Sequence, residues 1–452
     1  MSNWQGQYDN LILPALARSA ATQALLIAPG ALAQTGTVAT QVFASRKALV
    51  CADTAGFAAA GAAACAALRA AGFTVDTLVI PADPLPKASV EAAQVFLDRL
   101  SADSALMPVS VGSGVINDLV KYAAFESDRR YLSVATAASM DGYTSAGAPL
   151  AKNGFKVTIP VRAPIALIAD LDVIAAAPPE MTGWGYADLA GKSPAGGDWL
   201  LAELVGVEAR DDLAWPLVQD HLRGWLAAPE SVSDGGDGCA PLFIGLTAVG
   251  FAMEFHGSSR PASGADHQIA HMWEMEGHEH DGRKVSHGAA VAVGCVTALM
   301  FYDWLLNQNL EDLAPAAPDL SAALADLHTS IPDRGIAQRA EQETLAKWPN
   351  AQMHKDRITR IHRIWPETRA TLKHHLFRAD EMIAMLRSAQ SPALPQDIGI
   401  SLGHLRRTIR ASAFIRSRYT IVDFLKDLGL FEDAVDAVVA RQSDLSEKAM
   451  SL

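Results

Sequence analysis

Residues 106–126 read LMPVSVGSGVINDLVKYAAFE, and this stretch decides the fold. A mostly apolar run from Leu106 to Val111 leads into the turn Gly-Ser-Gly, and apolar residues then recur at the spacing of a helix. The run does not alternate strictly between apolar and polar residues. A nearly continuous apolar run is typical of a parallel strand that is buried on both faces. The stretch therefore predicts a strand, a tight turn and a helix of an open α/β domain.

The same alternation of strands and helices extends over the first part of the chain. We expect helices at residues 56–71 and 90–100. We expect strands at residues 48–51, 74–80, 106–111, 131–134, 156–160 and 165–169. Parallel strands separated by helices form a sheet that is covered on both faces. The sequence therefore predicts an N-terminal, Rossmann-like α/β domain with a parallel sheet, which we place at residues 1–180 and expect to bind a dinucleotide.

Beyond Pro178 and Pro179, long stretches rich in Ala, Leu, Trp and Met replace the strand pattern. Helices are expected at residues 199–205, 213–226, 285–306, 358–386 and 402–425. The uncharged run between Lys284 and Asp303 has the length of a membrane span, but it stands alone, so we predict a buried helix. Residues 181–452 are therefore expected to form an all-α domain.

The charge of the chain narrows the classes of partner. The chain has 452 residues, with 50 acidic and 37 basic side chains and a formal net charge of −13. An acidic protein is a poor electrostatic partner for nucleic acid or an anionic membrane. We therefore expect a small-molecule partner and no nucleic-acid or membrane partner, and we leave a homo-oligomer open.

Cysteine usage and the N-terminal residues indicate a reducing compartment. The four cysteines lie far apart in the sequence, without the paired spacing of a disulfide framework or a thiolate zinc cluster. They are Cys51, Cys65, Cys239 and Cys295. The first basic residue is Arg18, which argues against a secretory signal. We therefore expect a cytoplasmic protein.

The turn after the strand at 106–111 has the features of a dinucleotide site. Gly112 and Gly114 allow close approach of the backbone to a pyrophosphate, and the N-terminus of the next helix offers free N–H groups. The alternative is a purely structural turn between strand and helix. Asp53 follows the first strand, where a carboxylate binds ribose hydroxyls and favours NAD over NADP. Taken alone, an aspartate at this place is more often a helix N-cap.

Three histidines form the most informative pattern of the second half. His267 and His271 lie one helical turn apart, so both can face one cavity, and His287 opens the next apolar helix. Three imidazoles that converge at two helix ends could bind a divalent cation, with a carboxylate completing an open site. The alternative is that they are solvated like their neighbours. These neighbours are His256, His278 and His280.

Asp188 is the candidate for the missing oxygen ligand. Its sequence, Gly-Tyr-Ala-Asp-Leu-Ala-Gly-Lys, places Lys192 four residues later. The default interpretation is that Asp188 caps an apolar helix or forms a salt bridge with Lys192.

Taken in order, these stretches resemble the glycerol-1-phosphate dehydrogenase family. This family belongs to a superfamily with glycerol dehydrogenases, iron-containing alcohol dehydrogenases and dehydroquinate synthases. The resemblance covers approximately residues 46–300 and implies a dehydroquinate synthase-like fold. Its landmarks are Asp53, Gly112–Asp118, Thr136–Gly142, Ala163–Asp170, Asp188 with Lys192, His267, His271 and His287 with Gly288. Residues 319–452 are poorly covered.

The resemblance implies a role for each matched residue. Asp188, His267 and His287 match the metal ligands, of a single divalent ion for which we favour Zn²⁺ and leave Ni²⁺ or Fe²⁺ open. His271 and Asp141 match residues that contact the substrate, and they are the candidates for catalytic proton transfer. The cofactor is NAD or NADP, with NAD favoured. Its implied contacts are Asp53, Gly112, Ser113, Gly114, Val115, Ile116, Thr136, Ser139 and Ser145.

A phosphorylated substrate also needs cationic donors. Arg260 lies seven residues before His267 and Lys192 four after Asp188, so both are candidates to bind the phosphate. The alternative is that both form surface salt bridges. The implied substrate-binding residues are therefore Asp141, Asp188, Lys192, Arg260 and His271.

The function implied is hydride transfer that interconverts dihydroxyacetone phosphate and sn-glycerol 1-phosphate, or a similar small phosphorylated polyol. Two alternatives stay open within the superfamily. One is a polyol dehydrogenase acting on an unphosphorylated glycerol-type substrate. The other is a dehydroquinate-synthase-like lyase or cyclase with recycled NAD, although that branch typically carries glutamate in place of Asp188. A third alternative is a binding protein on a degenerate enzyme scaffold. Met140 departs from members that carry histidine there, and it borders the expected substrate pocket.

Overall fold

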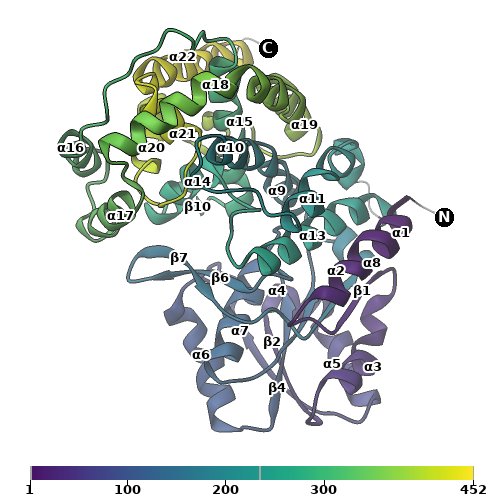
Figure 1. The fold of residues 1–452 in the computed structure, drawn as a ribbon. Helices are drawn as coiled ribbons and strands as arrows, with labels where there is room; N and C mark the ends of the chain where they lie inside the picture. The colour runs from purple at the N-terminus through teal and green to yellow at the C-terminus, as the bar shows by residue number, and fades with distance from the viewer. Residues whose placement is uncertain (1–2, 234–235, 451–452) are drawn as a thin grey trace. The chain divides into compact units, whose positions relative to one another are not determined.

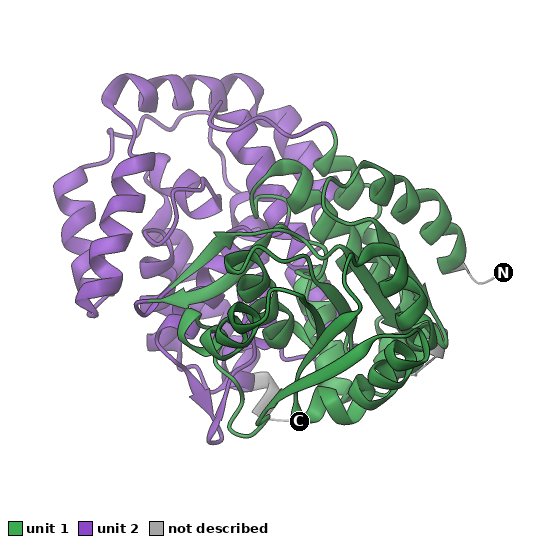
Figure 2. Ribbon diagram, turned by 90° about the horizontal axis from the view of Figure 1, so that it is seen from below, with its two compact units in different colours: residues 1–152, 156–189, 213–261 green, residues 153–155, 190–212, 262–452 purple. Residues whose placement is uncertain are grey.

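The computed structural model describes residues 3–233 and 236–450. The chain divides into two compact units (Figure 2). Unit 1 comprises residues 1–152, 156–189 and 213–261, and unit 2 comprises residues 153–155, 190–212 and 262–452. This division differs from the predicted single boundary at residue 180. The reason is that helix α13 (Ala240–His256) packs against α11 (Ala214–Gln219), α1 (Asn3–Gln7) and α2 (Leu13–Arg18), so residues 213–261 belong to unit 1.

Unit 1 is built on a six-stranded sheet of parallel strands. The strands are β1 (Ala24–Ala28), β2 (Lys47–Asp53), β3 (Thr74–Ile80), β4 (Leu106–Gly112), β5 (Leu132–Ala135) and β8 (Ala166–Asp170). Their order is β1-β8-β5-β4-β2-β3, and every neighbouring pair is parallel. The prediction of an α/β domain with a parallel sheet is confirmed.

Several strands differ from the sequence-based expectation. The strand expected at 156–160 exists as β7 (Phe155–Pro160), but it pairs with β6 (Gly147–Lys152) in a separate two-stranded sheet. β1 was not expected. It is an edge strand that pairs with β8, with Ala24 opposite Ala166.

Helices cover both faces of the sheet (Figure 1). On one face, α3 (Thr35–Val42) and α5 (Ala62–Ala70) pack against alternate residues of β2, among them Val50. On the other face, α6 (Val90–Ala102) and α7 (Gly114–Glu126) pack against the remaining ones, among them Leu49. Because both faces are buried, β2 is apolar from Ala48 to Ala52.

The strand order places a topological switch point between β2 and β4. These strands are neighbours, with Cys51 opposite Ser110 and Ala52 opposite Val111. The helix that follows β2 lies on one face of the sheet, and the helix that follows β4 lies on the other. Open α/β sheets bind ligands at the carboxyl ends of such strands, and Asp53 and Gly112 end β2 and β4 here.

The helices of unit 2 confirm the prediction of a helical second half. They are α10 (Lys192–Leu204), α14 (Ala265–Met275), α15 (His287–Leu305), α16 (Leu320–Ser330), α17 (Arg334–Lys347), α18 (Ala351–His375), α19 (Ala379–Ser388), α20 (Leu402–Ser412), α21 (Ile421–Asp427) and α22 (Phe431–Met450). The helix expected at 358–386 is broken into α18 and α19, because Leu376 and Arg378 adopt an extended backbone.

Helix α15 is the apolar helix expected between Lys284 and Asp303. Within the described residues it is the one helix long and apolar enough to cross a membrane, and 89% of its most apolar window is buried. It packs against α10, α14, α19 and α22 of the same unit. The prediction of a buried helix is therefore confirmed.

Candidate active site and metal centre

The connection between α14 and α15 brings two helix ends of unit 2 together. A short hairpin of β9 (Glu279–His280) and β10 (Arg283–Lys284) reverses the chain, and its turn residues Asp281 and Gly282 have φ of 50° and 71°. Ser286 then caps α15, where its side chain accepts the N–H of Ala289. The first residue of α15, His287, consequently lies beside α14.

The three predicted imidazoles converge within unit 2. The ring centroids of His267 and His287 are 5.3 Å apart, and those of His271 lie 5.8 Å from each of the other two. His267 is buried, His271 is mostly buried, and the side chain of His287 is 31% exposed. The three histidines are therefore brought together, and their roles as ligands or substrate contacts stay predictions.

Two of these imidazoles are each held by a carboxylate. Nδ1 of His267 lies 2.6 Å from Oδ2 of Asp266, and Nδ1 of His287 lies 2.8 Å from Oε1 of Glu274. A carboxylate can only accept, so Nδ1 carries a proton in both rings and Nε2 is the nitrogen that is left to coordinate a metal. Imidazole nitrogens in this state suit Zn²⁺, Fe²⁺ or Ni²⁺, so the donors of unit 2 fit the predicted metal.

Sequence reasoning missed both carboxylates, although the spacing of Glu274 was a usable signal. Asp266 directly precedes His267, and Glu274 follows His271 by three residues and His267 by seven. A spacing of three or seven residues places side chains on one helix face. Ligand atoms of Glu274, His271 and His287 lie within 4.8 Å of one another.

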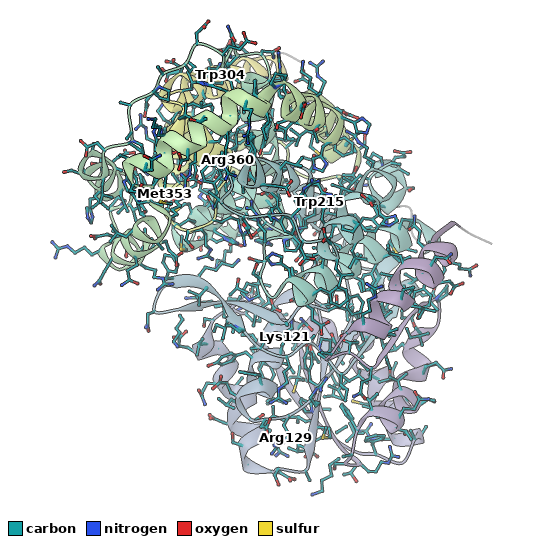
Figure 3. All side chains as sticks on the ribbon, viewed as in Figure 1. Lys121, Arg129, Trp215, Trp304, Met353 and Arg360 are labelled. Atoms are coloured by element: carbon teal, nitrogen blue, oxygen red, sulfur yellow. The ribbon has the colours of Figure 1, made fainter. Side chains whose placement is uncertain are left out.

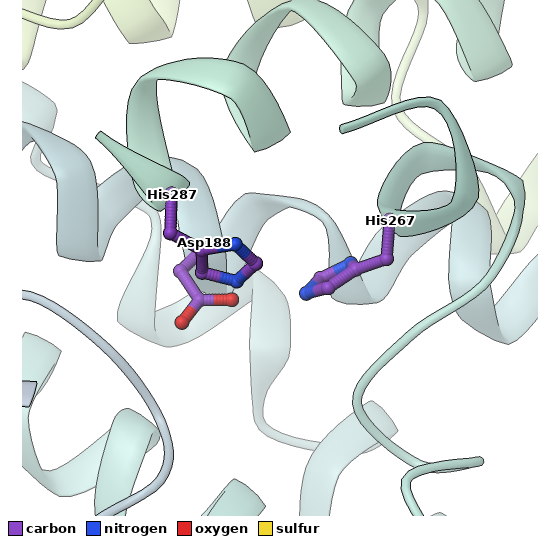
Figure 4. Close-up of side chains that lie close together, drawn as sticks. All are labelled: Asp188, His267 and His287. Carbon is purple, nitrogen blue, oxygen red and sulfur yellow. The ribbon is translucent and has the colours of Figure 1, made fainter. Parts of the chain in front are cut away.

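Asp188 belongs to unit 1. Figure 4 draws its side chain with those of His267, from α14, and His287, from α15. The carboxylate of Asp188 is fully buried, and its Oδ2 accepts the N–H of Asp141 at 3.0 Å. The default interpretation of Asp188 as an N-cap is wrong, because α9 spans Pro179–Ala190 and Asp188 lies in its last turn. A buried carboxylate at the negative end of a helix dipole needs a cation or donors to compensate it.

The glycines of the predicted dinucleotide turn are required by packing within the protein. A Cβ on Gly112 would lie 2.8 Å from Cβ of Ile116, and a Cβ on Gly114 would lie 2.8 Å from Cγ of Met140. The turn ends β4, and Ser113 is the N-cap of α7 without a side-chain capping bond. The free N–H groups of α7 therefore stand at the carboxyl end of the sheet, where the prediction places a pyrophosphate.

A buried lysine organises the loop that follows β5, and sequence reasoning missed it. Lys121 lies on α7 inside unit 1 (Figure 3), and its Nζ donates to the carbonyl oxygens of Gly142 at 2.6 Å and Gly147 at 3.1 Å. It also donates to Oγ of Ser145 at 3.2 Å and lies 3.5 Å from Oδ1 of Asp118. Burial lowers the pKa of Lys121 and raises the pKa of Asp118. Asp118 and Lys121, three residues apart, were a signal for such a pair.

The remaining predicted cofactor residues lie along the same edge of unit 1. The N–H of Thr136 donates to the carbonyl of Gly112 at 3.2 Å. Ser139 hydrogen-bonds to the hydroxyl of Tyr143, whose pKa is raised by burial. The hydroxyl of Ser145 donates to the carbonyl of Gly142 at 2.9 Å, so this side chain is engaged within the loop. Val115 is half-buried.

Asp53 caps a helix, which is the structural alternative to ribose binding. Its Oδ1 accepts the N–H of Gly56 at 2.6 Å, which caps the helix that follows β2. The role of Asp53 in binding a ribose stays a prediction. Asp141 is half-buried at the end of the loop after β5, where its N–H donates to Asp188.

Arg260 and Lys192 are both buried, with exposed fractions of 1% and 0%. The alternative that they form surface salt bridges is therefore wrong. Arg260 belongs to unit 1, where its backbone N–H donates to Oγ of Ser258 at 3.1 Å. Lys192 is the first residue of α10 in unit 2. Buried cations need anionic or carbonyl partners, and both side chains have partners within the protein, so their role in binding a phosphate stays a prediction.

Comparison with known proteins agrees with these features. Residues 26–178 match the model of the iron-containing alcohol dehydrogenase family. The chain is 30% identical over 362 residues to the glycerol-1-phosphate dehydrogenase [NAD(P)+] of Bacillus subtilis (strain 168), covering 78% of each chain. It is 35% identical over 293 residues to the glycerol-1-phosphate dehydrogenase [NAD(P)+] of Methanothrix thermoacetophila, covering 64% of this chain and 80% of that one.

Among solved structures, the fold is similar to that of a probable glycerol dehydrogenase from Sinorhizobium meliloti 1021. The TM-score is 0.62 at 16% sequence identity, and the match covers 94% of this chain and 99% of that one. At this level of identity the likeness supports the fold alone.

Proposed function

This chain belongs to the glycerol-1-phosphate dehydrogenase family, and we propose that it interconverts dihydroxyacetone phosphate and sn-glycerol 1-phosphate with one divalent metal ion and NAD as the preferred cofactor. Membership makes it an NAD(P)-dependent oxidoreductase of the polyol-phosphate class. The observation that carries the proposal is the cluster of three imidazoles in unit 2, two of which have a carboxylate on Nδ1 and therefore offer Nε2 to a metal.

His267 and His287, together with Asp188 of unit 1, would hold the metal, with Zn²⁺ favoured and Ni²⁺ or Fe²⁺ as alternatives. Two neutral imidazoles and one carboxylate leave a coordination position open in a tetrahedral site, as catalytic sites do. When bound, the metal supplies a Lewis acid and the nicotinamide supplies or accepts hydride. The buried position of Asp188 at the end of α9 is consistent with a cationic neighbour.

The other residues bind the substrate and move its proton. His271 stacks on His287, so its imidazole is placed to transfer a proton to or from the substrate oxygen, with Asp141 as the second candidate. Asp141 would also orient the polyol, and Arg260 and Lys192 would bind the phosphate. The turn at residues 112–116 and the loop after β5 would bind the cofactor, with Asp53 at the ribose.

We also propose a cytoplasmic location and a small phosphorylated molecule as the partner. The four cysteines are buried and not joined in disulfides, which suits a reducing compartment. The question of a homo-oligomer belongs to the same proposal and is answered by the mass of the purified protein in solution.

The deciding experiment measures oxidation of NADH and NADPH by the purified chain. The substrates are dihydroxyacetone phosphate, dihydroxyacetone and several sugar phosphates, before and after chelation and with Zn²⁺, Ni²⁺ or Fe²⁺ added back. We expect stoichiometric oxidation with dihydroxyacetone phosphate that is lost on chelation and restored by one of the ions. Formation of sn-glycerol 3-phosphate, or turnover of dihydroxyacetone alone, would contradict the proposed substrate pair. A reaction without net change of NADH would point to the cyclase class.

The phosphate assignment is tested with Arg260→Ala. We expect strongly reduced turnover of dihydroxyacetone phosphate, whereas any basal turnover of dihydroxyacetone stays as in the wild type. Arg223→Ala, at an exposed arginine of α12 (Leu222–Trp225), is the matched control. Equal loss with both substrates would contradict the assignment, and circular dichroism shows whether the variant is folded.

A further inference from the structure

We propose that Asp266 and Glu274 are positioning residues that hold the two metal-binding imidazoles of unit 2 in the orientation that presents Nε2 to the metal. This inference rests on the proposed metal site. Both carboxylates stand on α14, eight residues apart, and each is bonded to a different histidine. The motifs in the sequence assigned no role to either residue.

Asp266 is held on both of its oxygens. Oδ2 accepts the hydrogen bond of Nδ1 of His267 at 2.6 Å, and Oδ1 accepts the N–H of Gly264 at 2.9 Å. The side chain is fully buried, so no water competes for either oxygen. Its backbone is also fixed by α15, because a Cβ on Gly294 would lie 2.2 Å from the carbonyl oxygen of Asp266. A carboxylate with so little freedom holds the ring of His267 in one orientation.

Glu274 orients His287 in the same way, although the two residues stand on different helices. Its Oε1 receives Nδ1 of His287 at 2.8 Å, and its Oε2 lies 3.9 Å from Nε2 of His271. The side chain of His287 is 31% exposed, so packing leaves it freer than His267. The bond to Glu274 is therefore the main restraint on the direction of Nε2 of His287.

The arrangement has a definite chemical effect. A carboxylate on Nδ1 selects the tautomer with a lone pair on Nε2 and increases the basicity of that nitrogen. The loss of such a partner typically weakens metal binding by about 10- to 100-fold. Because Asp266 is buried and accepts two hydrogen bonds, we expect metal binding to weaken more when Asp266 is replaced than when Glu274 is replaced.

The test measures the affinity of the full-length protein for Zn²⁺ by competition with a chromophoric chelator, which does not depend on turnover. The variants are Asp266→Asn and Glu274→Gln, which keep the shape but remove the charge. We expect Zn²⁺ to bind about 10-fold or more weakly in each. Co²⁺ bound in place of Zn²⁺ should also show an altered visible spectrum, since the donor strength of the imidazoles changes.

Glu276→Gln is a matched control on the same segment of chain. Glu276 follows α14 directly, and its Oε2 lies 2.6 Å from Nε2 of His404, so it also forms a carboxylate–histidine pair. His404 lies on α20 and is not one of the three converging histidines. We expect unchanged Zn²⁺ affinity in this variant.

Four results would overturn the inference. Wild-type affinity in folded Asp266→Asn and Glu274→Gln, with loss in His267→Ala, would remove the positioning role and leave the proposed metal site standing. An equal loss in Glu276→Gln would show a general structural effect. Two ions per wild-type chain that fall to one in Glu274→Gln would make Glu274 a direct ligand. If the wild type binds no divalent metal, both the inference and the proposed metal site fail.

Discussion

Gly185 of α9 lies against the carbonyl oxygen of Ala138, so closely that a Cβ on the glycine would be 1.8 Å from that oxygen. Both residues belong to unit 1, and Ala138 stands in the loop between β5 and β6. Asp188 follows one turn later on the same helix and accepts the N–H of Asp141 from the same loop. The glycine therefore sets the approach of α9 to the loop that carries the predicted cofactor and substrate residues.

Gly185→Ala should consequently destabilise the protein. An added methyl group must displace backbone, and overpacking of this kind costs about 1–3 kcal/mol of unfolding free energy. Urea denaturation followed by circular dichroism measures the change. Gly224→Ala is the control, because a Cβ there meets nothing within 4 Å. Equal stability of the two variants would contradict this, because it would show that the contact between α9 and the loop accommodates the methyl group without loss of unfolding free energy.

Lys121→Met should unfold more easily and loosen the loop after β5. The substitution leaves the buried carboxylate of Asp118 without its cation and removes the donor to Gly142, Ser145 and Gly147. Breaking a buried ion pair costs about 3–5 kcal/mol. The unfolding free energy and the rate of proteolysis within residues 141–147 report the two effects. Lys47→Met, at an exposed ion pair with Asp103, should leave both measurements unchanged.

Lys426 should make stability depend on pH in the alkaline range. Its Nζ lies 4.1 Å from the ring centroid of Phe414 and 4.8 Å from that of Phe431, and burial lowers the pKa of Lys426 to about 8. Between pH 8 and 10 the unfolded chain, with a lysine pKa near 10.4, therefore binds more protons than the folded chain. The contribution of this residue to the unfolding free energy thus rises with pH, by up to about 1.4 kcal/mol per unit.

The measurement compares the wild type with Lys426→Met at pH 7 and pH 10. The difference in unfolding free energy should shift by about 2 kcal/mol in favour of the wild type at the higher pH. Lys373→Met, at an exposed lysine of α18, should show no such shift. A constant difference for Lys426→Met would mean that the buried amine keeps its ordinary pKa.

Removal of metal should lower the melting temperature. A ligand present at 100 times its dissociation constant adds about 2.7 kcal/mol to the stability of the folded state. We expect chelation to remove a stabilisation of this order and added Zn²⁺ to restore it. In His267→Ala the addition of Zn²⁺ should have little effect. An identical response of wild type and variant in differential scanning calorimetry would place the ion elsewhere.

The sequence predicted those features that depend on local periodicity. β3 was expected at 74–80 and occupies these residues, because β-branched and apolar residues mark even this partly exposed edge strand. β1 was missed although its residues, Ala24–Ala28, are apolar throughout. Helix α9 begins nine residues before Asp188. Gly183 and Gly185 hid this start, since glycine within a helix is read as a break.

For the candidate site, residue types were predictable and their partners were not. The three histidines were recognised because they share a helix face or open the next helix. Asp266 and Glu274 were overlooked because acidic residues on a helix are usually solvent-exposed, and the contact of Glu274 with His287 depends on the packing of α15 against α14. Lys121 was overlooked for the same reason, since lysine is rarely buried.

The interleaved course of the chain has a consequence for its synthesis on the ribosome. The parallel sheet is complete at residue 170, but α11 and α13 emerge only after α10, which belongs to unit 2. A nascent chain must therefore keep the apolar residues of α10 soluble until α14 and α15 have followed. A fragment cut at residue 180 would lack α13, which covers α1 and α2, and we expect it to aggregate. Neither unit is a module that evolution could exchange as one uninterrupted piece.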